Sequence, residues 1–222
     1  MGDAEGDDAY ASGGLRRMAE HMISPKPHTM KPWPAGCGLF LAGGHDMRKR
    51  LLLWETAGFF FVATAGTLLH FLYDWSGGSA FAAVLSGVNE STWEHMKLLF
   101  VPAFLFTAAQ VCALGQRYAN ILAVRAISIL IGLTLIPVLF YTYTGVLGYS
   151  VSWANISIFY VSVLTMFLLD FCLLRKGRWV APWQQLLGLL VLWALAFLFV
   201  WCTFQPPHLG LWQDPVTGNF GI

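Results

Sequence analysis

The chain has 222 residues, of which 57% are hydrophobic and only 11% are charged. This composition excludes an ordinary soluble domain and indicates a protein whose partner is the lipid bilayer. The formal net charge of +1 leaves no basic surface for the phosphates of a nucleic acid, so we expect no nucleic-acid partner.

The first 46 residues differ in composition from the rest of the chain. They are rich in glycine, aspartate, proline and serine and lack apolar periodicity, which predicts a disordered N-terminal extension over residues 1–46. Whether this extension is part of the natural protein is left open. The run Met47-Arg48-Lys49-Arg50 stands directly before a hydrophobic stretch. Residues 47–222 therefore form the predicted transmembrane domain.

Within this domain, five stretches are apolar over the roughly 20 residues that a helix needs to cross a bilayer. They are Leu52–Tyr73, Met96–Leu114, Ile121–Tyr143, Ser152–Leu174 and Gln184–Phe204. The connections between them are short, which predicts antiparallel neighbours in an all-α polytopic bundle. A homodimer is a further expectation, because five spans enclose little volume.

The basic residues flanking the spans predict an orientation. They lie before the first span, at the junction of the second and third, and between the fourth and fifth: Arg48, Lys49, Arg50, Arg117, Arg125, Arg175, Lys176 and Arg178. The other connections and the C-terminal tail contain no lysine or arginine. By the positive-inside rule, the N-terminus is cytoplasmic and the C-terminus is extracytoplasmic.

The densest polar stretch of the transmembrane domain covers residues 89–97, Asn-Glu-Ser-Thr-Trp-Glu-His-Met-Lys. A charge beside lipid is costly, so such a cluster at a helix end needs water or a partner. If this stretch is helical from residue 90, Glu90, Glu94 and Lys97 share one face, and His95 lies on the adjacent flank. Two carboxylates on one face repel each other, and a cation would relieve that repulsion.

The predicted topology brings more polar residues to the outer face. His70 and Asp74 end the first span there, four residues apart on one helix face, and His208 and Asp214 follow the fifth span. With the cluster they form one predicted ligand-binding site that faces outward: His70, Asp74, Asn89, Glu90, Glu94, His95, Lys97, His208 and Asp214.

Two acidic residues lie instead toward the inner ends of their spans, Glu55 in the first and Asp170 in the fourth. A buried carboxylate in a membrane needs a partner. We therefore expect them to pair with Arg125 or another arginine of the cytoplasmic side and to lock the helices together.

Three interpretations of the polar cluster compete. In the first it caps a helix, since Asn89 suits the N-cap and Ser91-x-x-Glu94 fits a capping box. In the second it belongs to a site for a small ligand or an ion. In the third it holds zinc or manganese for metal-assisted catalysis, with these candidate ligands: His70, Glu90, Glu94, His95 and His208.

The motif content leaves open whether the chain is an enzyme. The spacing of the candidate ligands matches no familiar zinc-protease signature such as H-E-x-x-H. The sequence contains no G-x-S-x-G elbow, P-loop or dinucleotide fingerprint, which disfavours serine nucleophiles and nucleotide use. Binding or transport of a small ligand or ion is the leading expectation. A metal-dependent membrane enzyme of hydrolase type and a structural or partner-binding membrane subunit are the alternatives.

Three segments carry a resemblance to a known family. They are His70-Phe-Leu-Tyr-Asp-Trp-Ser-Gly, the stretch with the motif N-E-S-x-W-E-H-x-K, and the tail over residues 205–218. With these, the chain resembles an uncharacterised family of small bacterial multi-pass integral membrane proteins, a domain of unknown function, over roughly Met47–Ile222. The resemblance implies location in the cytoplasmic membrane of a bacterium, and it brings no activity or site residue with it.

Overall fold

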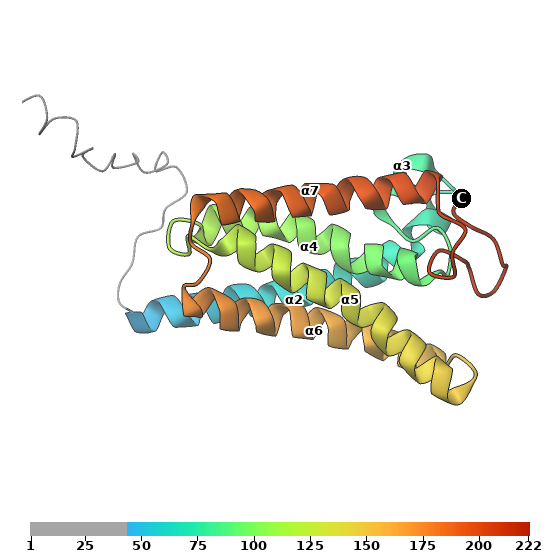
Figure 1. The fold of residues 1–222 in the computed structure, drawn as a ribbon, viewed down its shortest axis with the longest axis horizontal. Helices are drawn as coiled ribbons and strands as arrows, with labels where there is room; N and C mark the ends of the chain where they lie inside the picture. The colour runs from blue at the N-terminus through green and yellow to red at the C-terminus, as the bar shows by residue number, and fades with distance from the viewer. Residues whose placement is uncertain (1–43) are drawn as a thin grey trace, which may run out of the picture. The chain divides into compact units, whose positions relative to one another are not determined.

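The computed structural model describes residues 44–222, which form a bundle of helices (Figure 1). The helices are α2 (Gly44–Trp75), α3 (Ala80–Leu85), α4 (Thr92–Leu114), α5 (Ile121–Leu147), α6 (Ser152–Lys176) and α7 (Pro182–Phe204). Within this described range, β pairing is limited to a single bridge between Gln213 and Phe220. The predicted extension over residues 1–46 lies almost wholly outside the described residues.

Five of these helices, α2, α4, α5, α6 and α7, are long and apolar enough to cross a membrane. Continuous apolar segments fold as helices in lipid because a helix satisfies its own backbone N–H and C=O groups. Helices α5 and α6 each end at a glycine with positive φ, Gly148 at 80° and Gly177 at 59°, a conformation that other residues rarely adopt. The prediction of an all-α bundle with five candidate membrane spans is confirmed.

Small residues allow the helices to approach one another closely. A Cβ atom at Gly188 of α7 would lie 2.6 Å from the carbonyl oxygen of Leu122 in α5. A Cβ atom at Gly66 of α2 would lie 2.7 Å from the carbonyl oxygen of Leu98 in α4. Membrane helices use small residues in this way because lipid provides no hydrophobic drive between them, so packing must come from close contact.

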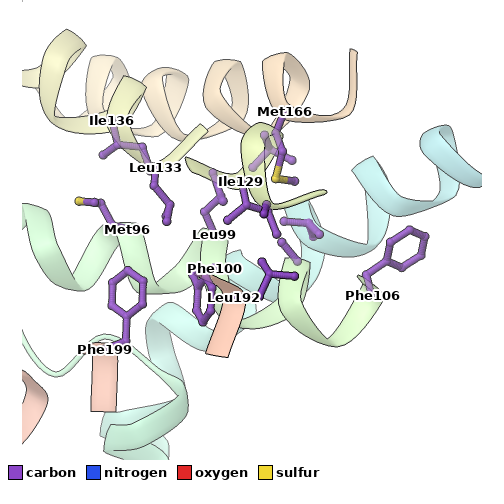
Figure 2. Close-up of a cluster of buried hydrophobic side chains, with 14 of the residues drawn as sticks. Met96, Leu99, Phe100, Phe106, Ile129, Leu133, Ile136, Met166, Leu192 and Phe199 are labelled. Atoms are coloured by element: carbon purple, nitrogen blue, oxygen red, sulfur yellow. The ribbon is translucent and has the colours of Figure 1, made fainter. Parts of the chain in front are cut away.

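Large apolar side chains fill the space between α4, α5, α6 and α7 (Figure 2). The labelled ones come from all four helices: Met96, Leu99, Phe100, Phe106, Ile129, Leu133, Ile136, Met166, Leu192 and Phe199. Apolar side chains also cover the outside of the bundle, where Leu53 and Phe60 are 68% and 62% exposed. A soluble bundle would carry polar side chains there, so this surface fits a lipid environment.

The C-terminal tail, residues 205–222, folds over the end of the bundle where α2 ends and α4 begins (Figure 1). The backbone N–H of Trp93 donates to the Leu211 carbonyl oxygen at 3.0 Å, and the Asn89 amide donates to the Gly221 carbonyl oxygen at 3.0 Å. All residues of the predicted outward-facing site lie at this end. That the end is extracytoplasmic, with a cytoplasmic N-terminus, stays a prediction of the positive-inside rule.

Candidate functional site

The start of helix α4 separates the polar cluster into two parts. Ser91 is the N-cap, with extended backbone, and its hydroxyl accepts a hydrogen bond from the Glu94 N–H at 3.3 Å. Glu90 therefore precedes the helix, and the prediction that it shares a helical face with Glu94 and Lys97 is wrong. Asn89 is not the cap either, because its side-chain oxygen accepts from the Ser91 N–H at 3.0 Å and so forms the turn before the helix.

The first part is a cluster of three side chains that we call the outer triad: His70 from α2, Glu90 from the connection before α4, and His95 from α4. Glu90 lies between the imidazoles, with one carboxylate oxygen 3.6 Å from Nε2 of His70 and the other 3.6 Å from Nε2 of His95. One ligand-type atom from each residue lies within 4.8 Å of the other two. The side chains are 29–51% exposed, so water and solutes reach them.

The hydrogen bond of His95 fixes which ring nitrogen carries its proton. Nδ1 of His95 lies 2.9 Å from the carbonyl oxygen of Ser91. A carbonyl oxygen only accepts, so Nδ1 is the donor, and in the neutral ring Nε2 keeps a free lone pair. In that neutral form the lone pair belongs to the nitrogen that faces Glu90, so two acceptors would face each other across the outer triad. Such a backbone contact is the usual way in which a protein orients a metal-binding histidine.

The second part is a buried ion pair between Glu94 and Lys97, with 2.6 Å between Oε2 and Nζ. Lys97 Nζ also donates to the Ala83 carbonyl oxygen and to the Thr203 hydroxyl, at 2.8 Å each. All three ammonium donors are thus used, and Glu94 accepts a further bond from the Val88 N–H at 3.2 Å. The pair ties α3, α4 and α7 together and is closed to solvent, which makes its role structural.

The remaining candidates lie apart from the outer triad. Asp214 accepts from the Val216 N–H and the Thr217 hydroxyl, at 2.8 and 2.7 Å, and so holds a turn of the tail. The exposed His208 ring packs on Phe220, with 4.6 Å between ring centroids. Asp74 is exposed at the end of α2. Among the described residues, the structure therefore groups only His70, Glu90 and His95 as a set of metal-ligand type.

A cavity of about 250 Å³ opens beside the outer triad. It lies between α4, α5, α6 and the tail, and its lining residues are Glu90, Thr92, His95, Ile136, Phe140, Ser150, Ser152, Asn155, Ile158, Phe159, Pro215 and Val216. Its lining combines apolar and aromatic side chains with hydroxyl and amide groups. No sequence pattern predicts this cavity, because its walls come from ordinary residues of four separate segments.

A further group of polar side chains, here called the inner network, lies inside the bundle: Glu55 of α2, Gln110 of α4, Arg125 of α5 and Asp170 of α6. The predicted ion pair between Arg125 and Asp170 is confirmed. Glu55 pairs differently, because its carboxylate accepts from the Gln110 amide at 2.6 Å. Sequence reasoning missed Gln110, since a neutral amide in an apolar span carries no charge pattern.

Comparison with protein families and known proteins gives one result. Residues 46–222 match the family of unknown function DUF6512. No curated protein and no solved structure matches the chain. The matched range covers every described helix except the first residues of α2. By this match, the chain belongs to the family of unknown function DUF6512.

Proposed function

We propose that the chain is a membrane protein that binds a divalent metal ion through the outer triad and uses the metal to bind a small ligand in the adjacent cavity. The observation that supports this function is the meeting of two imidazoles and one carboxylate, from His70, His95 and Glu90, within 4.8 Å of one another. Zinc sites that act on ligands commonly have three protein ligands of these types and keep a fourth position open.

The geometry of the outer triad is close to that of a metal site. Ligand atoms about 2.0–2.1 Å from a tetrahedral zinc ion lie about 3.4 Å from one another. Glu90 is 3.6 Å from each imidazole, so small side-chain movements would complete the set. A cation between the carboxylate and the Nε2 lone pair of His95 would also remove the unfavourable approach of two acceptors. Zinc suits this mixture of nitrogen and oxygen ligands better than manganese, which prefers oxygen.

The cavity determines the chemistry of the ligand. Glu90 and His95 belong to both the outer triad and the cavity lining, so an open position on the metal would face this space. The aromatic side chains of Phe140 and Phe159 suit an apolar body, and the hydroxyl groups of Ser150 and Ser152 suit a polar head. A small carboxylate with an apolar body fits both kinds of lining group and can place an oxygen on the metal.

Ligand binding is better supported than hydrolysis. Glu94, the other carboxylate among the predicted metal ligands, is buried in its ion pair with Lys97 and so is not available as a general base. Within the part of the chain that the structure describes, Glu90 is the sole carboxylate lining the cavity, and it serves as a metal ligand in this proposal. A metal-dependent hydrolase would need a second group to accept a proton.

Metal content tests the first half of the proposal. Protein purified in detergent is expected to hold close to one zinc ion per chain by elemental analysis. His70→Ala removes one of three ligands and is expected to weaken zinc binding by more than about 100-fold, the upper range for loss of an outer-shell partner alone. His208→Ala is the matched control, because His208 is an exposed histidine at the same end of the bundle and should keep its zinc. Equal zinc in the two variants, or none in the wild type, would contradict the proposal.

Ligand binding at the metal tests the second half. In cobalt-substituted protein, benzoate is expected to shift the visible absorption spectrum of the metal as its carboxylate enters the open position. Ser152→Trp fills the cavity without changing a residue of the outer triad, so it should keep the cobalt and lose the benzoate shift. A benzoate shift of the same size in this variant would show that ligands do not reach the metal through the cavity.

A further inference from the structure

The inner network contains more negative than positive groups. The Arg125 guanidinium is engaged by Asp170, and it also donates to the Thr107 hydroxyl at 3.2 Å and to a backbone carbonyl of α4 at 3.3 Å. Glu55 forms its hydrogen bond with the neutral amide of Gln110. If both carboxyl groups were ionised, the network would hold one uncompensated negative charge among apolar helices, which is costly in lipid.

Two oxygen atoms of the Glu55–Gln110 pair indicate how the uncompensated charge is neutralised. Glu55 Oε2 and Gln110 Oε1 are buried and have no hydrogen-bond partner among the described residues. While Glu55 is ionised both atoms can only accept, whereas a carboxylic acid has an O–H group that donates. We propose that Glu55 carries a proton on Oε2 and donates it to Gln110 Oε1, so that the inner network is a proton-binding site inside the membrane span.

One proton satisfies both oxygens in this arrangement. Gln110 Nε2–H donates to Glu55 Oε1 at 2.6 Å, the Glu55 hydroxyl donates back to Gln110 Oε1, and the two groups form a cyclic acid–amide pair. Reversing the amide, whose oxygen and nitrogen are hard to distinguish, does not remove the need for a proton. The 2.6 Å contact would then join two oxygens, which also requires a hydrogen between them.

Other charged and titratable groups lie close to Glu55. Asp170 on α6 adds negative charge close to Glu55, and Arg125 on α5 is shared between the two acids. Tyr118, in the connection between α4 and α5, is a further titratable group close to Glu55. From α4, the group in contact is the neutral Gln110. Loss of the proton would leave two carboxylates with one guanidinium, so the proton also stabilises the contact of α2 with α4.

Infrared spectroscopy of the purified full-length protein tests this proposal. At neutral pH the wild type is expected to show the carbonyl band of a protonated carboxylic acid, shifted in heavy water, and Glu55→Gln is expected to lack it. Glutamine keeps the shape of the acid and can still pair with Gln110, so this variant should fold. Glu90→Gln, at an exposed glutamate, is the matched control and should keep the band. Absence of the band in the wild type, or its presence in Glu55→Gln, would overturn the proposal.

A second variant and the pH dependence of thermal stability test the proposal independently. Gln110→Leu removes the amide donor, so the Glu55 carbonyl band should persist and move to higher frequency; an unmoved band would overturn the acid–amide pair. The wild type should also lose thermal stability as pH rises above the acidic range in which free carboxyl groups ionise, because the folded state still holds a proton that the unfolded chain has released. Glu55→Gln should lack that slope. A stabilisation by sodium that requires Glu55 would identify a metal cation as the occupant and overturn the proposal.

Discussion

Arg125→Met is expected to lower the free energy of unfolding by about 3–5 kcal/mol or more, the cost of removing one partner of a buried ion pair. The Arg125 and Asp170 side chains are both 0% exposed, so no water replaces the lost guanidinium. The variant leaves Asp170 unpaired, removes the hydrogen bond to Thr107, and leaves Glu55 beside a bare carboxylate. The measurement is a denaturation curve in detergent, with the fraction of monodisperse protein as a second readout.

Two further substitutions separate charge from geometry at Arg125. Arg125→Lys keeps the charge but loses the planar group that reaches both α4 and α6. Its free energy of unfolding should therefore lie between that of the wild type and that of Arg125→Met. Arg117→Met removes an exposed arginine and should change stability by about 0.5 kcal/mol or less. Similar stability of Arg125→Met and Arg117→Met would mean that water reaches the inner network.

Lys97→Met is expected to lower the free energy of unfolding by about 3–5 kcal/mol, because it removes one partner of the buried ion pair at the other end of the bundle. The methionine fills a similar volume but donates no hydrogen bond, so the Glu94 carboxylate is left buried without its cation. The Ala83 carbonyl oxygen and the Thr203 hydroxyl also lose their donor. A lower melting temperature should be accompanied by easier proteolysis near α3, because Lys97 hydrogen-bonds to both α3 and α7.

A double substitution tests whether the ion pair itself causes this loss. Glu94→Gln combined with Lys97→Met removes both charges, and the Gln side-chain oxygen can still accept from the Val88 N–H. The double variant should regain much of the stability lost in Lys97→Met, since neutral replacement of a whole buried pair is often tolerated. Lys176→Met, at an exposed lysine of α6, should be close to the wild type. A double variant no more stable than the single one would show that the contacts of Lys97 with α3 and α7 matter more than its charge.

The sequence was sufficient for the five long helices and for the grouping of polar residues at one end of the bundle. Apolar segments of the required length have few alternatives in lipid, so the five candidate spans could be predicted from hydropathy alone. The pairing of Arg125 with Asp170 was predictable as well, because a membrane leaves few partners for a buried acid.

Side-chain directions at the helix start could not be predicted. A helical projection that begins at residue 90, two residues before α4, places Glu90 with Glu94, whereas the cap at Ser91 turns Glu90 toward His70 instead. The burial of Glu94 depends on Ala83 of α3 and on α7, which are distant in sequence and contribute a backbone oxygen and a hydroxyl. No sequence motif indicates contacts of this kind. The cavity next to the outer triad has the same origin, because it exists only once the tail lies over α5 and α6.

The fold of the tail also affects how the protein should be handled. Gly221 accepts from the Asn89 side chain, and its φ of 63° and its closeness to Pro206 leave little room for change. A purification tag joined after Ile222 would therefore begin next to Gly221, which contacts Asn89, the residue before Glu90. A tag placed ahead of α2 would enter at the opposite end of the bundle (Figure 1). Metal content should therefore be measured on protein that carries the tag at the N-terminal end.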